Sequence, residues 1–331
     1  MAKRHTFSGD ELSRYFDRVC IPESKRVFDA SKLSDPDKLA YLNLLQKHHL
    51  VKVPWENLTQ HYSWHRVVHL KPEHLFRKIV ESPGRGGYCM EVNFFFHLIL
   101  YSLNFDVYMV GSRIYKEPIG RYGGWTHVVN LCRVGGERYL LDGGFGGQGP
   151  TRPVCLEHEA TTEHVTPAQM RVVYENIPNN VDTAQKVWVY QHRHDMNSPW
   201  KPMYCFVDLE FTPEDVDSMN FAPSMSRHTF FTHKVVAVRF TSDREYESLE
   251  GPGSASQDAL TGEIDGSITI NHDVLKWRRH GKKVVVIPFK SDQERVDALK
   301  KYFGISLPED DREAIINTAA MIGVGAMGVD D

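Results

Sequence analysis

Three residues of the chain carry side chains that together can transfer an acyl group through a covalent intermediate. Cys89 offers a thiol, His127 an imidazole and Asp142 a carboxylate. An unperturbed thiol ionises only near pH ~8.5, so a nucleophilic cysteine needs a helix N-terminus or a neighbouring imidazole that favours the thiolate. The set therefore predicts nucleophilic acyl transfer, in which His127 activates Cys89 and Asp142 orients the imidazole.

The sequence around Cys89 predicts that the thiol lies at the start of a buried helix. The breaker at residues 82–84 ends the preceding segment, and residues 90–103 are apolar on most sides. The N–H groups and the dipole of a helix N-terminus favour a thiolate and can also stabilise an oxyanion. Gly86 and Gly87 leave the backbone before the thiol without Cβ atoms, which we expect to give a carbonyl substrate room to approach.

His127 and Asp142 belong to two short β-rich runs that a tight connection joins. The first run covers residues 126–132 and the second, residues 138–141, ends just before Asp142. An antiparallel pair of these strands would make the two side chains neighbours. Each residue of the three also has a structural explanation, as a buried apolar thiol, a core imidazole or a turn carboxylate. Their combination favours a catalytic triad.

The periodicity of the remaining sequence divides the chain into three parts. Residues 1–104 have the apolar spacing of amphipathic helices, and residues 105–213 contain short β-rich runs separated by glycine pairs, as in an antiparallel barrel or sandwich. Residues 214–331 combine strands with a helix that Ser291 caps, and include a predicted loop at Gly251 to Gln257. The fold class predicted is therefore α+β with several domains.

The composition is that of a folded cytoplasmic protein. The 331 residues are 41% hydrophobic and 25% charged, which is in the globular range. A net charge of -4, with only a local basic cluster at residues 278–283, argues against nucleic-acid binding. Residues 1–19 lack the pattern of a signal peptide, and no apolar run is long enough for a membrane span. Five widely spaced cysteines without a C-x-x-C pair indicate neither disulfides nor a metal site.

Four segments resemble one enzyme family, the arylamine N-acetyltransferases. Arg85 to Glu91 reads R-G-G-Y-C-M-E and resembles the R-G-G-x-C-x-E signature of the family, and Val53 to Leu58, V-P-W-E-N-L, resembles its V-P-F-E-N-L element. The segments Thr126-His127 and Asp142 to Gly146 follow in the order of the family. The resemblance covers most of residues 12–240. It implies a helical bundle, a β-barrel and an α/β lid, with a triad arranged as in cysteine proteases.

The resemblance also implies a reaction and further site residues. The reaction would be ping-pong: Cys89 takes the acyl group of acetyl-CoA, a co-substrate, and an arylamine or arylhydrazine then removes it, with no permanently bound cofactor and no metal. Phe145 would stack on the acceptor. Arg85 and Glu91 would form an ion pair that sets the cysteine turn. Contacts to the acyl-CoA are expected from the loops and the hydroxyl-rich segment that hold Gly124, Trp125, Gly146, Ser224, Ser226 and Thr229.

Several alternatives stay open at the level of the sequence. Malonyl-CoA or propionyl-CoA would serve the same chemistry as acetyl-CoA. A cysteine hydrolase or a transglutaminase-like enzyme would use the same three residues, because these enzymes differ only in the acyl acceptor. A binding module that had kept the fold without the activity is a third possibility. The sequence identifies neither the acceptor amine nor the oligomeric state.

Overall fold

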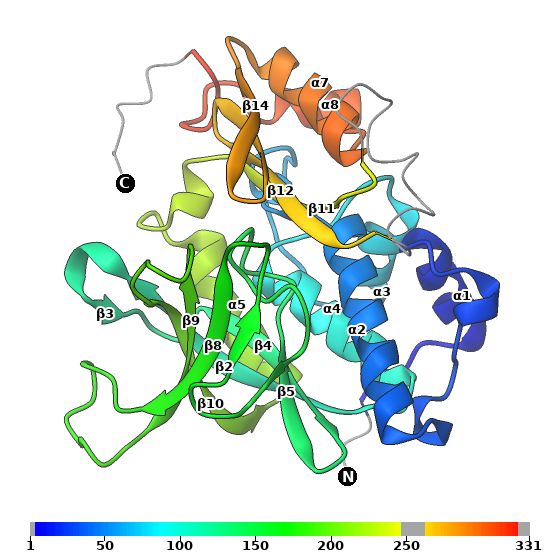
Figure 1. Cartoon of the computed structure of the whole chain (residues 1–331). Helices are drawn as coiled ribbons and strands as arrows, with labels where there is room; N and C mark the ends of the chain where they lie inside the picture. Colours follow the sequence, from blue (N-terminus) through cyan, green and yellow to red (C-terminus); the bar gives the residue numbers. More distant parts are fainter. Residues whose placement is uncertain (1–3, 246–261, 324–331) are drawn as a thin grey trace.

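The N-terminal part of the chain is mainly helical in the computed structural model, which describes residues 4–245 and 262–323. Ser8 and Glu11 form a capping box at the first helix, and Ser34 caps the second. These helices lie on one side of the molecule (Figure 1). The elements are α1 (Gly9–Arg18), η1 (Glu23–Lys25), η2 (Ala30–Lys32), α2 (Asp35–Lys52), η3 (Leu58–Gln60), α3 (Pro72–Phe76), the π-helical turn η4 (Arg77–Glu81) and α4 (Cys89–Ser102).

The middle of the chain forms a nine-stranded antiparallel sheet that is nearly closed into a barrel. Its order is β6-β5-β4-β2-β10-β9-β8-β7, with β3 paired to β2. A bridge between His158 and Val172 brings the ends of this order together. The 3₁₀ turn η5 (Glu117–Ile119) lies between β2 and β3. The strands are β2 (Asp106–Lys116), β3 (Arg121–Tyr122), β4 (His127–Val134), β5 (Glu137–Leu141), β6 (Val154–Cys155), β7 (Thr161–Glu163), β8 (Gln169–Glu175), β9 (Val187–Arg193) and β10 (Lys201–Phe211).

The C-terminal part forms a second, five-stranded antiparallel sheet above the barrel (Figure 1). Its first strand comes from the N-terminal part, where Trp55 pairs with Val238. Helix α7 covers the sheet through an apolar cluster that includes Leu299 and Trp277. The elements are β1 (Trp55–Glu56), α5 (Pro213–Met225), η6 (Phe230–Thr232), β11 (Val236–Ser242), β12 (Ile264–Asn271), β13 (Val274–Arg279), β14 (Lys282–Pro288), α7 (Asp292–Phe303) and α8 (Glu309–Glu313).

Most of the predicted elements are confirmed, and the misses have physical causes. Strand β1 has two residues, too few for a periodicity, and forms only because β11 offers a partner. The basic cluster at residues 278–283 is the tip of the β13–β14 hairpin. The predicted loop at residues 251–257 lies outside the described residues. Within the described residues, none of the helices has the length and apolar character that a membrane span needs.

Candidate active site

Cys89 is the first residue of α4, and its side chain is almost completely buried. The backbone of Tyr88, the N-cap, is extended, and its N–H donates to Glu91 Oε2 at 3.2 Å. The Cys89 thiol donates to the carbonyl of Thr126 at 3.7 Å. The predicted helix start is thus confirmed. Since the first N–H groups of a helix have no carbonyl partner within it, this end of α4 can stabilise an oxyanion.

The two glycines before the thiol have a different role from the predicted one. A Cβ on Gly86 would lie 1.9 Å from the carbonyl oxygen of Pro54, and a Cβ on Gly87 would lie 2.5 Å from Glu91 Oε2. The space beside both glycines is therefore filled by the protein itself. The prediction that they leave room for a carbonyl substrate is wrong, because they let the V-P-W-E-N-L segment and helix α4 approach the turn closely.

His127 and Asp142 lie on neighbouring strands and bind each other. His127 begins β4 and Asp142 directly follows β5, its antiparallel partner. The His127 Nε2 and Asp142 Oδ2 atoms are 2.8 Å apart, and both side chains are buried. The Cys89 side chain is close enough to the His127 ring to help raise the pKa of the imidazole. The structure thus brings together all three residues that the sequence singled out.

The charges of this group favour an imidazolium next to a carboxylate. Burial by itself lowers the pKa of His127, but the negative charge of Asp142, the hydrogen bond to Asp142 and the nearby Cys89 side chain outweigh it and raise the pKa to about 10. Burial acts to raise the pKa of Asp142, yet His127 and the hydrogen bonds from Asn93 and the Gly144 N–H lower it overall. Asp142 therefore keeps His127 protonated, which stabilises a thiolate on Cys89.

Asn93 holds the carboxylate in place. Its Nδ2 donates to Asp142 Oδ1 at 2.8 Å and to the Val128 carbonyl at 2.7 Å, and its Oδ1 accepts from the Gly143 N–H at 2.7 Å. Asn93 is fully buried. We assigned it no role from the sequence, although a signal was present, since a polar residue four positions after Cys89 on an apolar helix lies on the same face as the thiol.

The glycine-rich loop after Asp142 forms a wall of the site. A Cβ on Gly144 would lie 2.6 Å from the Cα of Cys89, so no side chain fits at that position. The ring centroid of Phe145 lies 5.8 Å from that of His127 and 5.1 Å from that of Tyr204. Tyr204 in turn lies 5.2 Å from the His127 ring. Phe145 is thus beside the imidazole, and its stacking on an acceptor stays a prediction.

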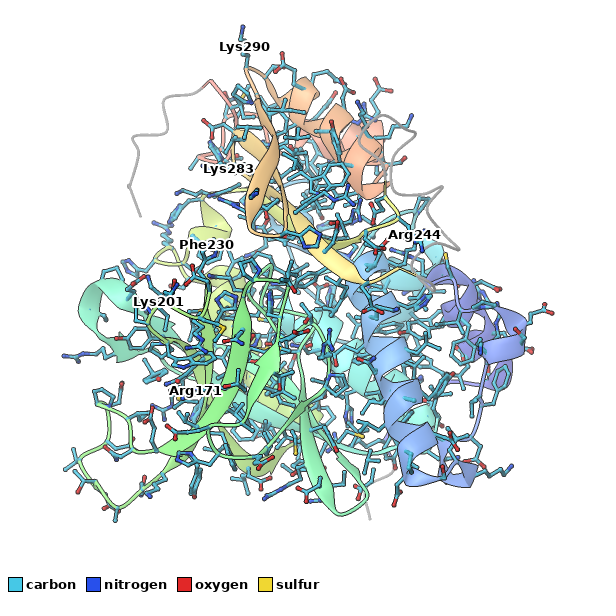
Figure 2. The ribbon with its side chains drawn as sticks, viewed as in Figure 1. Arg171, Lys201, Phe230, Arg244, Lys283 and Lys290 are labelled. Carbon is cyan, nitrogen blue, oxygen red and sulfur yellow. The ribbon has the colours of Figure 1, made fainter. Side chains whose placement is uncertain are left out.

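The five-stranded sheet contacts the other end of this loop. A Cβ on Gly146, whose φ is +88°, would lie 3.7 Å from the Trp55 ring, and one on Gly147 would lie 2.8 Å from Ser267 Oγ. The Trp55 ring also lies 6.5 Å from that of Phe230, which Figure 2 shows between the barrel and the C-terminal sheet. The loop is therefore enclosed by residues from both sheets.

The other residues predicted to contact acyl-CoA lie in two places. Gly124 and Trp125 precede Thr126, whose carbonyl accepts the thiol hydrogen bond, and the space beside Gly124 is open. The guanidinium carbon of Arg113 lies 4.1 Å from the ring centroid of Trp125, and the ring centroids of Trp125 and Phe211 are 5.7 Å apart. This loop is thus next to Cys89, and its contact with acyl-CoA stays a prediction.

The second group of predicted acyl-CoA contacts is Ser224, Ser226 and Thr229, whose hydroxyl groups form hydrogen bonds within their own segment. Ser224 Oγ donates to the carbonyl of Asn220 at 2.6 Å, inside α5. Ser226 Oγ accepts from the His228 N–H at 3.3 Å, and Thr229 caps the turn η6. Ser224 thus belongs to α5, whereas Ser226 and Thr229 lie in the turn that follows it, and the contact of all three with acyl-CoA likewise stays a prediction.

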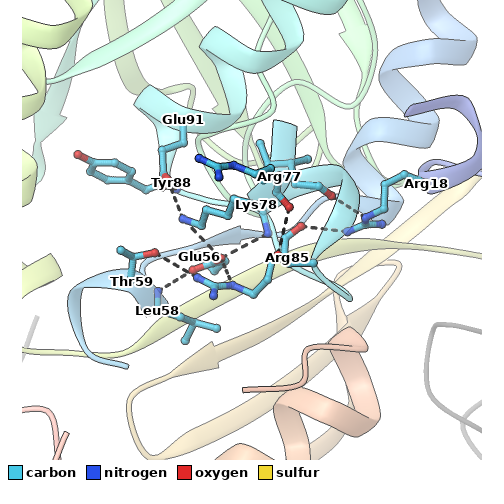
Figure 3. A network of polar contacts seen from close by, with 12 residues as sticks. Arg18, Glu56, Leu58, Thr59, Arg77, Lys78, Arg85, Tyr88 and Glu91 are labelled. Atoms are coloured by element: carbon cyan, nitrogen blue, oxygen red, sulfur yellow. Dashed lines mark hydrogen bonds and ion pairs between the residues drawn. The ribbon is translucent and has the colours of Figure 1, made fainter. Parts of the chain in front are cut away.

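The predicted ion pair between Arg85 and Glu91 is replaced by two other pairs (Figure 3). Arg85 Nε binds Glu56 Oε1 at 2.9 Å, and Glu91 Oε1 accepts from Lys78 Nζ at 2.7 Å. The prediction was right that both residues set the cysteine turn and wrong about their partners. Both partners lie outside the R-G-G-Y-C-M-E motif, so the spacing of the motif held no information about them.

The comparisons with known proteins agree with this geometry. A family model described as N-acetyltransferase matches residues 38–251. The chain belongs to the arylamine N-acetyltransferase family. It is 28% identical to the N-malonyltransferase FDB2 of Gibberella moniliformis over 94% of this chain and 93% of the relative. It is 25% identical to arylamine N-acetyltransferase 2 of Mus musculus over 90% of this chain and 94% of that one.

Solved structures of the family share the fold. The arylamine N-acetyltransferase of Mycobacterium abscessus superposes with a TM-score of 0.75, at 22% identity, over 97% of this chain and 99% of that one. That of Mycobacterium marinum, solved in complex with CoA, gives 0.70 at 23% identity over 91% and 96%. Family membership makes the chain an acyltransferase and argues against the hydrolase and transglutaminase alternatives.

The pKa shifts of His127 and Asp142 predict how stability depends on pH. The raised pKa of His127 contributes stability that is fully present below pH 6.5 and is lost as the pH rises toward 10. The lowered pKa of Asp142 contributes stability that is present above pH 3.8 and is lost as the pH falls further. Thermal unfolding of the wild type and of Asp142→Asn is expected to show the largest difference in Tm between pH 3.8 and 6.5. A difference that stays constant up to pH ~10 would contradict the His127–Asp142 charge pair.

Proposed function

We propose that the chain is an arylamine N-acetyltransferase that carries the acyl group of acetyl-CoA on Cys89. The observation that supports this most strongly is the hydrogen bond between His127 and Asp142 beside the Cys89 thiol at the start of α4, where Asp142 and Cys89 both act to raise the pKa of His127. This arrangement supplies a nucleophile, a base and an orienting carboxylate within one buried group. The CoA complex of the Mycobacterium marinum relative supports acyl-CoA as the co-substrate.

The proposed reaction has two halves that use the same residues. In the first, the Cys89 thiolate attacks the thioester carbonyl, the N–H groups at the start of α4 stabilise the oxyanion, and the CoA thiolate leaves with the proton held by His127. In the second, an arylamine or arylhydrazine nitrogen attacks the Cys89 thioester and gives its proton to His127. The thiolate of Cys89 is then expelled and pairs again with the imidazolium.

The remaining parts of the molecule are assigned supporting roles. Phe145, beside the His127 ring, would stack on the aromatic acceptor. Residues 1–104 would form a helical bundle and residues 105–213 a barrel, with the site between them. Residues 214–331 would act as a lid over that site. The nearness of Gly147 to Ser267, whose Oγ an added Cβ would meet at 2.8 Å, supports this division, since it brings the site loop against the C-terminal sheet. The free thiol state of all five cysteines supports a cytoplasmic location. The biological role proposed is the detoxification of foreign amines.

Malonyl-CoA is the alternative donor, favoured by the similarity to the N-malonyltransferase. Turnover of acetyl-, propionyl- and malonyl-CoA with a panel of arylamines and arylhydrazines decides between them. We expect CoA and N-acylated amine to form in equal amounts with acetyl-CoA, and the donor with the highest kcat/KM identifies the natural acyl group. CoA release that continues at an unchanged rate without any amine would mean hydrolysis and would contradict N-acylation.

A further inference from the structure

Lys78 is a buried cation that the proposed reaction does not use directly. It lies in the π-helical turn η4, a rare conformation that is frequent at functional sites. Its side chain is 7% exposed, and its Nζ lies 2.7 Å from Glu91 Oε1 and 3.9 Å from Glu56 Oε1 (Figure 3). A lysine is rarely buried unless its charge is compensated, so these two carboxylates are the reason that Lys78 can lie there.

Both carboxylates that Lys78 contacts also hold the backbone just before Cys89. Glu91 Oε2 accepts from the N–H of Tyr88, and Glu56 Oε1 accepts from the N–H of Gly86 at 3.3 Å. Lys78 therefore contacts both carboxylates, Glu56 and Glu91, that hold the backbone at the start of α4. A displacement of this turn would move the thiol away from His127.

The charges around Lys78 balance. It faces Glu56 on β1 and Glu91 on α4, and Arg85 binds the same Glu56 oxygen that Lys78 approaches. His74 on α3 is close enough for Lys78 to contribute to lowering its pKa, after the larger effect of burial. Burial raises the pKa of Glu91, while Lys78 opposes that rise. The negative charges of Glu56 and Glu91 are thus balanced by the positive charges of Lys78 and Arg85.

We propose that Lys78 is a positioning residue for Cys89, whose ammonium neutralises Glu91 in the first turn of α4 and so keeps the thiol reactive and directed at His127. This inference rests on the proposed role of Cys89 as the nucleophile. Without Lys78, a charged Glu91 would oppose a negative charge on the neighbouring thiol, and a protonated Glu91 would bind the Tyr88 N–H less strongly.

The test is Lys78→Met, which keeps the apolar stem and removes the charge. We expect alkylation by iodoacetamide at pH ~7, and the burst of CoA from acetyl-CoA, to slow about tenfold. The acid limb of the alkylation profile is expected to move about one pH unit higher, with KM for acetyl-CoA nearly unchanged. Lys78→Arg should recover most of the rate. Lys47→Met is the matched control. Lys47 on α2 is a largely buried lysine paired with Glu263 and bound to the Gly262 carbonyl, so its loss should leave the wild-type profile unchanged.

A double variant keeps the proposal testable if Lys78→Met folds poorly. Lys78→Met with Glu91→Gln removes both charges and leaves an oxygen for the Tyr88 N–H, so alkylation should return to within about threefold of the wild type. A double variant no faster than a folded Lys78→Met, or a Lys78→Met profile equal to that of the wild type, would overturn the proposal. A wild-type protein without a CoA burst would instead show that the proposed function itself fails.

Discussion

Cys89→Ser is expected to lower the rate of amine acylation by about 10³-fold or more, because a hydroxyl in the same position does not ionise beside His127. Serine has nearly the shape of cysteine, and the start of α4 is held by Tyr88 and Glu91 rather than by the thiol, so the fold should persist. Steady-state turnover with acetyl-CoA and an arylamine measures the loss, and stopped-flow CoA release without the amine measures the burst. We expect the burst to vanish.

A matched control separates loss of the nucleophile from loss of a buried thiol. Cys205 on β10 is as deeply buried, and burial raises the pKa of its thiol to about 12, so it is unreactive at neutral pH. Cys205→Ser should keep turnover within about threefold of the wild type. A folded Cys89→Ser protein that kept more than about a tenth of the wild-type rate would exclude the thioester pathway.

Asp142→Asn is expected to lower kcat by about 10³-fold to 10⁴-fold while the protein stays folded. The asparagine fits the same space, but the negative charge that raises the pKa of His127 is lost, and burial then lowers that pKa. The imidazole would no longer hold the proton of the Cys89 thiol. Steady-state kinetics give kcat and KM, and the rate of iodoacetamide labelling at pH ~7 reports the reactivity of the thiol.

The control for this variant is another buried carboxylate. Asp265 on β12 is paired with Arg279 and accepts from Thr241 in the five-stranded sheet. Asp265→Asn removes a comparable charge away from the thiol, so it should reduce stability more than kcat. Equal losses of kcat in Asp142→Asn and Asp265→Asn would mean that the effect of Asp142 is structural and does not involve orienting His127.

The sequence predicted the parts of the site that depend on local patterns. The helix that begins at Cys89 follows from a breaker, a short turn and an apolar run, all within about twenty residues. The approach of His127 and Asp142 follows from two β-rich runs with a short connection. The family signature then joined these local features to a known fold. Each of these steps needed only residues that are close in sequence.

The remaining features depend on contacts that no local sequence pattern marks. Lys78 replaced Arg85 as the partner of Glu91 because the π-helical turn directs it under α4, and no motif marks such a turn. The strand at Trp55 exists only through its pairing with Val238, far along the chain. The role of Gly86 was misjudged for the same reason, since the atom that excludes a side chain there belongs to Pro54.

The central claim is that the acyl group passes through a thioester on Cys89, and the mass of the intact protein tests it most directly. The wild type is mixed with acetyl-CoA without an amine, quenched in acid within seconds and weighed by mass spectrometry. We predict a gain of one acetyl group, located on the peptide that contains Cys89, absent from Cys89→Ser and lost when an arylamine is added before the quench. An unmodified Cys89 in a preparation that acetylates the amine would contradict the account.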